Sequence, residues 1–308
     1  MVDRSATEIL AQARSRAIGL ALVGVAGCST STGPTAEASA CVWPRFGSPE
    51  AVTLLNYTGD AMEPFVTRDG ALLFFNDSNA PGRDTQLHVA TRVDALTFRH
   101  EGALAGANSS ALDGVASVAS GTLYFVSTRS YATTLGTVYR AELQGLAASS
   151  VEFVPGVSRG RAGWVNFDAE ITASGERLFL VDGLYDAPSM GWKETALVVA
   201  ARGADGVFSR TASTELAAVQ WDGGIEYAPS TSADERTLYV TRFAKGTTAP
   251  RLFVATRPSA SEPFCAPREV AEAEGFVEAA TVAPDGSIYY HRRDDDGVFR
   301  VKHLPVAR

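Results

Sequence analysis

The chain has 308 residues, of which 45% are hydrophobic and 20% are charged, a composition typical of a folded protein and not of a disordered one. Its net charge of −8 argues against a nucleic-acid partner, because phosphates are bound by basic surfaces. No apolar run reaches the roughly 20 residues that a membrane-spanning helix needs. Three cysteines without a C-x-x-C spacing argue against a disulfide-built scaffold and against a structural zinc site.

The N-terminus has the features of an export signal. Arg14 and Arg16 precede an apolar run at 17–26, and small residues follow it up to Cys28. A basic flank, a short apolar core and a small-residue exit predict a secretory signal peptide over residues 1–27. A short buried helix is the alternative.

The end of this signal carries a resemblance of its own. The residues Val-Ala-Gly-Cys at 25–28 resemble the lipobox of bacterial lipoproteins, which implies that Cys28 is lipidated and becomes the mature N-terminus. Ser29 behind it implies anchoring to the outer membrane, with the protein facing the periplasm or the surface. Residues 28–41 are mostly small and polar and predict a flexible tether, and residues 42–308 are expected to form the folded domain.

Five repeats of one hairpin phrase make up that domain. In its clearest form, at 281–290, apolar and β-branched residues flank the dipeptide Asp285-Gly286, which readily takes the positive φ of a tight turn between two strands. The second residue of the turn recurs at intervals of 51 to 60 residues, at Gly70, Gly121, Gly175, Glu235 and Gly286. An internal period of this length indicates a repeat architecture with one small sheet in each unit.

Each hairpin is followed by a third strand, and the first four are also followed by a fragment of a fourth. The fifth repeat has no fourth strand behind it, but an equivalent segment at 45–55 precedes the first repeat. We therefore predict an all-β, five-bladed β-propeller in which this N-terminal outer strand completes the last blade, since a closed ring leaves only short sheet edges. Period-2 patterning excludes a helical solenoid, whereas an open β-solenoid and a sixth blade stay as alternatives.

The first and fifth repeats also carry a family resemblance. The Pro-Asp-Gly phrase at 284–286 followed by Tyr289 and Tyr290, and the Arg-Asp-Gly turn of the repeat at 63–75, resemble the TolB-like WD40 or PD40 β-propeller repeat. The resemblance extends over residues 43–304 and weakens in the middle three repeats, where Ser or Glu departs from Asp-Gly. It implies a periplasmic or surface scaffold, commonly with six blades.

An acidic residue lies near the start of the innermost strand in every repeat. These residues are Glu63, Asp113, Asp168, Glu226 and Glu278. The innermost strands of a propeller line its channel, so the five carboxylates could ring one mouth, where close like charges raise pKa values or attract a cation. The alternative is that each carboxylate accepts hydrogen bonds from a neighbouring loop and locks two blades together.

The loops between the second and third strands are expected to project from one face, and loops on a rigid scaffold commonly carry binding sites. The longest loop, at 182–193, contains Tyr185, Met190 and Trp192, a set that fits a partner-binding surface. Alternatively, Trp192 folds back on its own blade.

Cys41 and Cys265 lie in two matching outer segments. If the N-terminal segment closes the ring, they could form a disulfide that staples the closure in an oxidising compartment. The four histidines lack H-x-H and H-E-x-x-H spacings, so we expect no His-based metal site and no cofactor. They are His88, His100, His291 and His303.

These features favour a monomeric, lipid-anchored envelope β-propeller that binds another envelope protein or a surface ligand and is not an enzyme. The main alternative is a glycosidase-like hydrolase that uses the channel carboxylates, because glycoside hydrolysis needs two carboxyl groups about 5–9 Å apart around a sugar-sized pocket. A carrier that holds a small molecule or a cation in the channel is the third interpretation.

Overall fold

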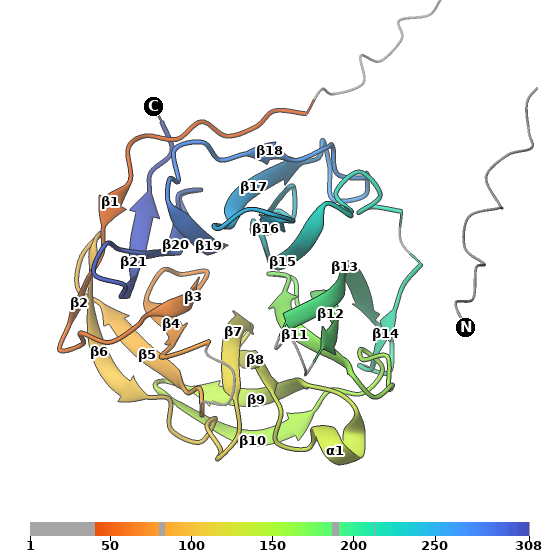
Figure 1. Ribbon diagram of the computed structural model, residues 1–308. Helices are drawn as coiled ribbons and strands as arrows, with labels where there is room; N and C mark the ends of the chain where they lie inside the picture. The colour runs from red at the N-terminus through yellow and green to blue at the C-terminus, as the bar shows by residue number, and fades with distance from the viewer. Residues whose placement is uncertain (1–40, 80–83, 187–190, 213, 308) are drawn as a thin grey trace, which may run out of the picture. The chain divides into compact units, whose positions relative to one another are not determined.

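A computed structural model of the protein describes residues 41–79, 84–186, 191–212 and 214–307. Five separate β-sheets circle a common axis, each with one strand next to that axis (Figure 1). The predicted five-bladed β-propeller is confirmed, and the described residues contain no sixth blade.

The blades are numbered in chain order. From the innermost strand outwards, blade 1 has β3 (Met62–Val66), β4 (Leu72–Asn76), β5 (Leu87–Arg92) and β6 (Thr97–Ala103), and blade 2 has β7 (Asp113–Ala119), β8 (Thr122–Ser127), β9 (Val138–Gln144) and β10 (Ala147–Phe153). Blade 3 has β11 (Trp164–Ile171), β12 (Arg177–Asp186), β13 (Gly191–Arg202) and β14 (Phe208–Arg210), and blade 4 has β15 (Gly224–Thr231), β16 (Thr237–Ala244), β17 (Arg251–Thr256) and β18 (Arg268–Glu269). Blade 5 has β19 (Phe276–Val282), β20 (Ile288–Arg293), β21 (Phe299–Leu304) and β1 (Glu50–Ala51). The short helix α1 (Tyr131–Thr134) connects β8 and β9, and no helix in the described part of the sequence has the length and apolarity to cross a membrane.

The N-terminal segment closes the ring in two steps. Strand β1 pairs antiparallel with β21, with Glu50 opposite His303, so it is the outer strand of blade 5, as predicted. Strand β2 (Thr53–Leu55) then pairs parallel with β6 of blade 1, with Leu54 opposite Phe98. The single strand expected over 45–55 is therefore two short strands, which join the last blade to the first.

The core is divided among the contacts between neighbouring blades. The described residues form five hydrophobic clusters, one at each blade-to-blade contact. Between blades 5 and 1, for example, Phe75 and Phe98 pack with Tyr289 and Val301. Burial of each large apolar side chain contributes about 1.5–3 kcal/mol, so the faces of the blades hold the ring together and leave its centre free for polar groups.

A repeated arginine at the end of the third strand adds to these contacts. In blade 3, Arg202 Nε donates to the carbonyl of Gly175 in its own hairpin turn (2.9 Å), and Nη2 donates to the Tyr124 hydroxyl of blade 2 (2.7 Å). Its guanidinium lies 4.7 Å from the ring centre of Phe208, a favourable cation–π contact. Equivalent positions over phenylalanine rings are taken by Arg92 and Arg257. The third strands of blades 1, 3 and 4 thus end at or next to an arginine that links two parts of the ring, whereas those of blades 2 and 5 have no arginine there.

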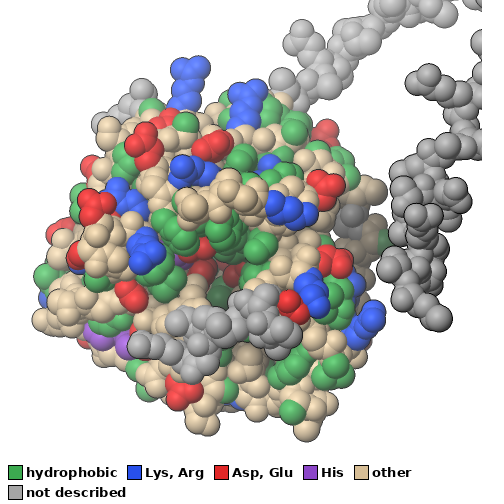
Figure 2. Space-filling model, viewed as in Figure 1, with side chains coloured by type: hydrophobic (Ala, Val, Ile, Leu, Met, Phe, Trp, Pro, Cys, Tyr) green, Lys and Arg blue, Asp and Glu red, His purple; other side chains and the backbone are tan. Residues whose placement is uncertain are grey.

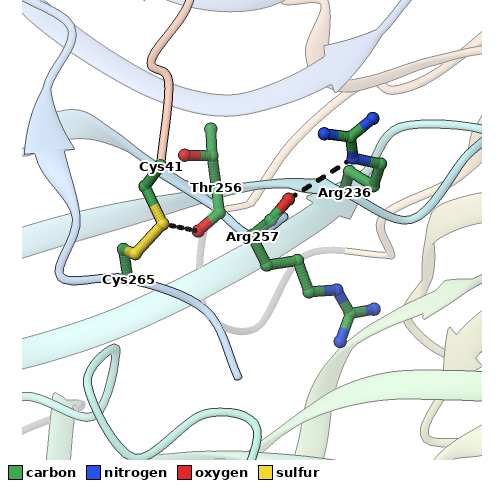
Figure 3. Close-up of a disulfide and its surroundings, with 5 residues drawn as sticks. All are labelled: Cys41, Arg236, Thr256, Arg257 and Cys265. Carbon is green, nitrogen blue, oxygen red and sulfur yellow. Dashed lines mark hydrogen bonds between the residues drawn. A yellow bond between two sulfur atoms is a disulfide. The ribbon is translucent and has the colours of Figure 1, made fainter. Parts of the chain in front are cut away.

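A disulfide between Cys41 and Cys265 holds the start of the described sequence on blade 4 (Figure 3). The two Cα atoms are 6.5 Å apart, and Cys41 Sγ also lies 3.4 Å from the carbonyl oxygen of Thr256 at the end of β17. Cross-links of this kind typically contribute about 2–4 kcal/mol, mainly by restricting the unfolded chain. The segment is therefore fixed on blade 4 shortly before it pairs with blade 5.

Candidate active site

Each innermost strand is irregular near its start, and this irregularity sets the direction of the side chains there. The pairing register shifts in all five innermost strands. Glu63 lies within the shift in β3 with a φ of 47°, and Asp168 directly follows the shift in β11. An extra residue bends a strand and turns its side chains in a new direction. Both carboxylates line the central cavity as a result.

Three of the five predicted carboxylates, Glu63, Asp168 and Glu278, form one group although they come from blades 1, 3 and 5. Glu63 and Glu278 are connected through His291 of β20. The backbone N–H of Glu63 donates to Nδ1 of this histidine (3.0 Å), and the distance from its Nε2 to Oε2 of Glu278 is 2.9 Å. Because Nδ1 accepts a hydrogen bond, the proton of the neutral ring is assigned to Nε2, which donates to Glu278.

Glu278 is fixed on its other side by Tyr227 of β15. The Tyr227 hydroxyl donates to Oε1 of Glu278, so both oxygens of the carboxylate accept a hydrogen bond. Burial and the charge of Glu278 raise the pKa of Tyr227 well above its ordinary value, which keeps the hydroxyl a donor. An ionised carboxylate is the form that accepts two such bonds.

Burial shifts the ionisation of the other two members. Burial raises the pKa of Glu63 to about 8 against the opposing effect of His291, and the charges of Asp168 and Glu278 act in the same direction as burial. Burial also raises the pKa of Asp168 to about 7, opposed by a hydrogen bond from the Ala228 N–H (2.9 Å) and assisted by Glu278. Burial lowers the pKa of His291, but its hydrogen bond to Glu278 and the surrounding charges outweigh burial and raise it above the ordinary value.

The remaining two predicted carboxylates lie outside this group. Asp113 is fully buried and accepts hydrogen bonds from Ser109 and from Arg129 (2.6 Å). Glu226 accepts one from Arg242 Nε (2.9 Å), and burial raises its pKa to about 7 against the effect of that arginine. The expected ring of five carboxylates is therefore a group of three and two ion pairs, each made within one blade.

The central cavity is narrow. It gives the centre of a water molecule about 30 Å³, and since one water needs roughly 10–15 Å³ by this measure, it has room for about two. Figure 2 shows acidic side chains inside the hollow at the middle of the face drawn.

The cavity is crossed on the side of the β3–β4 turn by Arg68, which donates to Oε1 of Glu170 and to the carbonyl of Thr231, each at 2.7 Å. Arg68 therefore joins blade 1 to blades 3 and 4 at one end of the cavity, and the loops between the second and third strands lie at the opposite mouth.

The predicted partner-binding loop contributes an aromatic row at that mouth. Trp192 stacks on Phe167 of its own blade, with ring centres 4.1 Å apart and planes 18° apart. Tyr185 meets Trp192 edge-on at 5.4 Å and is 36% exposed. Met190 lies outside the described residues.

Two further expectations concern lipid and metal. Cys28, the expected lipidation site, lies outside the described residues. Within the described ranges, no cluster of three or more His, Cys, Asp or Glu residues is arranged to hold a metal ion.

Sequence reasoning did not assign a role to His291 or Tyr227. The hairpin register places Glu278 directly opposite His291, but only because the pairing shifts between Glu278 and Thr281. Counting outwards from the Asp285-Gly286 turn pairs Glu278 with Arg292 instead, so no sequence signal pointed to the histidine. Nothing in the repeat pattern points from Tyr227 to a carboxylate of the next blade.

Comparison with solved structures gives the fold independent support. A structure described as a complex of BT0996 with RGII is similar over 86% of this protein and 92% of its own length, with a TM-score of 0.57 and 12% identity. An endo-arabinase from Bacteroides thetaiotaomicron VPI-5482 is similar over 84% of this protein and 98% of its own length, with a TM-score of 0.53 and 14% identity. TolB from Acinetobacter baumannii also matches, over 81% of this protein and 55% of its own length, with a TM-score of 0.42 and 13% identity. No protein-family model and no curated protein sequence matches the chain.

These comparisons correct two expectations. Most of the similar structures are glycoside hydrolases, among them a family 117 enzyme from Zobellia galactanivorans, a family-43 enzyme and an exo-β-1,3-galactanase from Phanerochaete chrysosporium. The predictions of a non-enzymatic scaffold and of a protein that is not an enzyme are contradicted, and the hydrolase alternative is favoured. The TM-score of TolB is too low to carry an argument, so the family resemblance holds at the level of the β-propeller. At these identities, what this protein is shown to share with the hydrolases is the five-bladed fold.

Proposed function

We propose that this protein is a glycosidase-like hydrolase that uses the carboxylates at the mouth of its channel. The observation that carries the proposal is the group of three carboxylates from three blades, in which burial raises the pKa of two members while the third accepts hydrogen bonds on both oxygens. Groups of like chemistry with different ionisation states are what acid–base catalysis needs.

Glu63 is the proton donor in this proposal. With a pKa of about 8, its carboxyl group keeps its proton at neutral pH. It transfers that proton to the glycosidic oxygen as the bond from the anomeric carbon to this oxygen breaks. Asn79 Nδ2 donates to Oε1 of Glu63 (2.7 Å) and so orients the carboxyl group.

Asp168 is the proton acceptor. Burial raises its pKa to about 7, and the hydrogen bond that it accepts from the Ala228 N–H favours the ionised form. The carboxylate takes a proton from a water molecule whose oxygen attacks the anomeric carbon, and the central cavity has room for that water. Proton uptake by Asp168 and proton release by Glu63 balance, and the products are two sugar fragments.

Glu278 acts through the other two carboxylates. Its charge raises the pKa of both Glu63 and Asp168. His291 and Tyr227 hold it in place by one hydrogen bond each. Glu278 is therefore a positioning residue that keeps the proton on the donor.

A hydrolysis assay on the full-length protein tests the proposal. The substrates are aryl α-L-arabinofuranoside, aryl β-D-galactopyranoside, arabinan and β-1,3-galactan, and the variants are Glu63→Gln and Asp168→Asn. Hydrolysis of at least one substrate is expected, with a loss of about 10²–10⁴-fold in either variant and no loss in Glu176→Gln, which removes an exposed carboxylate of a hairpin turn. Absence of hydrolysis on all four substrates, or full activity in both channel variants, contradicts the proposal.

We also propose that the protein is exported and anchored to the outer membrane by a lipid on Cys28, on the strength of its signal sequence alone. Expression in a Gram-negative host with radiolabelled palmitate should label the wild-type protein and not the Cys28→Ser variant. Labelling that persists in the variant, or an unlabelled wild-type protein, contradicts it.

A further inference from the structure

We infer that the aromatic row on blade 3 is a binding wall for a carbohydrate chain, which it holds against the channel carboxylates. The inference rests on the proposed function and deepens it by naming an oligosaccharide, and not a single sugar, as the substrate class. The row consists of Tyr185, Trp192, Phe167 and Tyr227.

The row is continuous from the rim to the carboxylates. From Tyr185, which is 36% exposed, the ring centres follow at 5.4 Å to Trp192, 4.1 Å to Phe167 and 6.3 Å to Tyr227. Tyr227 donates to Glu278. Phe167 is the residue before Asp168 in β11. The row thus ends on Glu278, and Phe167 belongs to the strand that carries Asp168.

The local fold is built to make this row. Tyr185 and Trp192 lie opposite each other in the β12–β13 pairing. Gly183 leaves the space that they need, because a Cβ at this position would come within 2.7 Å of both Phe167 and Trp192. A side chain at this position would push the stacked rings apart, so the glycine is required by the close approach of the two rings and not by its own φ.

The chemistry of the row suits a sugar. Large aromatic faces with few polar groups bind the C–H face of a sugar ring, and a few polar groups at the edge fix its hydroxyls. The ion pair of Lys193 with Asp186 (2.8 Å) supplies such groups beside Tyr185 and Trp192. The exposed ring of Tyr185 and the half-buried ring of Trp192 offer stacking surface for more than one sugar residue, and the exposed end at Tyr185 lets a carbohydrate chain continue into solvent.

Binding without turnover tests the inference separately from hydrolysis. The probes are arabinohexaose and β-1,3-galactohexaose, titrated into the full-length protein carrying Glu63→Gln, with intrinsic fluorescence and calorimetry as readouts. Binding of at least one hexasaccharide is expected. Trp192→Ala should weaken it about tenfold, the equivalent of one lost aromatic stack, and Tyr185→Ala about threefold.

Two further variants control for folding. Trp192→Leu keeps an apolar side chain over Phe167 but removes the aromatic face, so it should fold and still lose affinity. Trp43→Ala removes a partly buried tryptophan that contacts Arg268 on blade 4 and should leave the affinity unchanged. Unchanged affinity in Trp192→Leu, or no binding of either hexasaccharide, overturns the inference. Tryptophan-dependent binding without hydrolysis by the wild-type protein supports the inference and contradicts the proposed function alone.

Discussion

The innermost strands carry two kinds of buried carboxylate, and they differ in what neutralises them. Asp113 and Glu226 each accept a hydrogen bond from an arginine of the same blade. Among the described contacts, the carboxylates of Glu63 and Asp168 accept hydrogen bonds from neutral groups only. Asn79 donates to Glu63, and the Ala228 N–H donates to Asp168. The arginine opposes the effect of burial on the pKa of Glu226, which is still raised to about 7, whereas for Asp168 burial is opposed only by a hydrogen bond from a neutral N–H.

The two kinds of carboxylate arise because Asp113 and Glu63 lie two residues apart in position along equivalent innermost strands. Asp113 precedes the irregularity of β7 and pairs opposite Ser127, close to the loop that supplies Arg129. Glu63 lies within the irregularity of β3 and points into the cavity. A single change of register thus separates a carboxylate that is paired with an arginine from one that faces the cavity.

The largest expected effect is on the free energy of unfolding, which should change differently when the two kinds of carboxylate are replaced. Asp113→Asn leaves Arg129 without its counter-charge and should lower the free energy of unfolding by about 2–3 kcal/mol, the low end for a buried pair because 21% of the Arg129 side chain is exposed. Glu63→Gln replaces a buried acid with a neutral amide and should change it by less than about 1 kcal/mol at pH 5, close to the ordinary glutamate pKa. Urea unfolding of both variants measures these changes, and equal losses of stability would contradict the division into two kinds of carboxylate.

The pH dependence of stability should sharpen the comparison between the two kinds of carboxylate. Because the pKa of Glu63 is raised from 4.5 to about 8, the folded state binds a proton that the unfolded state releases. The stability that this bound proton contributes is complete below about pH 4.5 and is lost as the pH rises through about 8. Between pH 5.5 and 7.5 the stability of the wild type relative to Glu63→Gln should fall by about 1 kcal/mol per pH unit, close to the limit for one proton. Urea unfolding at these two pH values should show this fall, and a pH-independent difference contradicts the raised pKa.

The smallest effect concerns the third carboxylate. Tyr227→Phe removes one hydrogen bond to Glu278, worth about 1 kcal/mol, and should lower kcat/KM for the best substrate by about threefold to tenfold. Tyr57→Phe removes a tyrosine hydrogen bond to the Asp60 carbonyl outside the channel and should leave kcat/KM unchanged. Equal effects in the two variants would mean that Glu278 needs no fixing.

The ring could be predicted from the sequence, and the group of carboxylates only in part. Turn dipeptides and the displaced segment at 45–55 report on local pairing, and local pairing determines five blades and their closure. The parallel pairing of β2 with blade 1 has no sequence signal of this kind, because it depends on where the closed ring brings two segments together. The acidic residues were found as a set, but their division depends on strand irregularities at Glu63 and near Asp168 that no turn residue encodes.

The function was predicted wrongly for a related reason. Repeat phrases describe the scaffold, and several chemistries can share one scaffold. His291 reaches Glu278 across the hairpin of blade 5, and Tyr227 reaches the same carboxylate from blade 4. These contacts depend on a register shift and on blade packing, which the repeat phrases do not describe.

The most direct measurement is a pH titration of the Glu63 carboxyl carbon by NMR, with ¹³C-labelled glutamate and the Glu63→Gln variant for assignment. The structure predicts a midpoint near pH 8. A midpoint near the ordinary glutamate value, about 4.3, would mean that Glu63 is ionised at neutral pH and cannot be the proton donor.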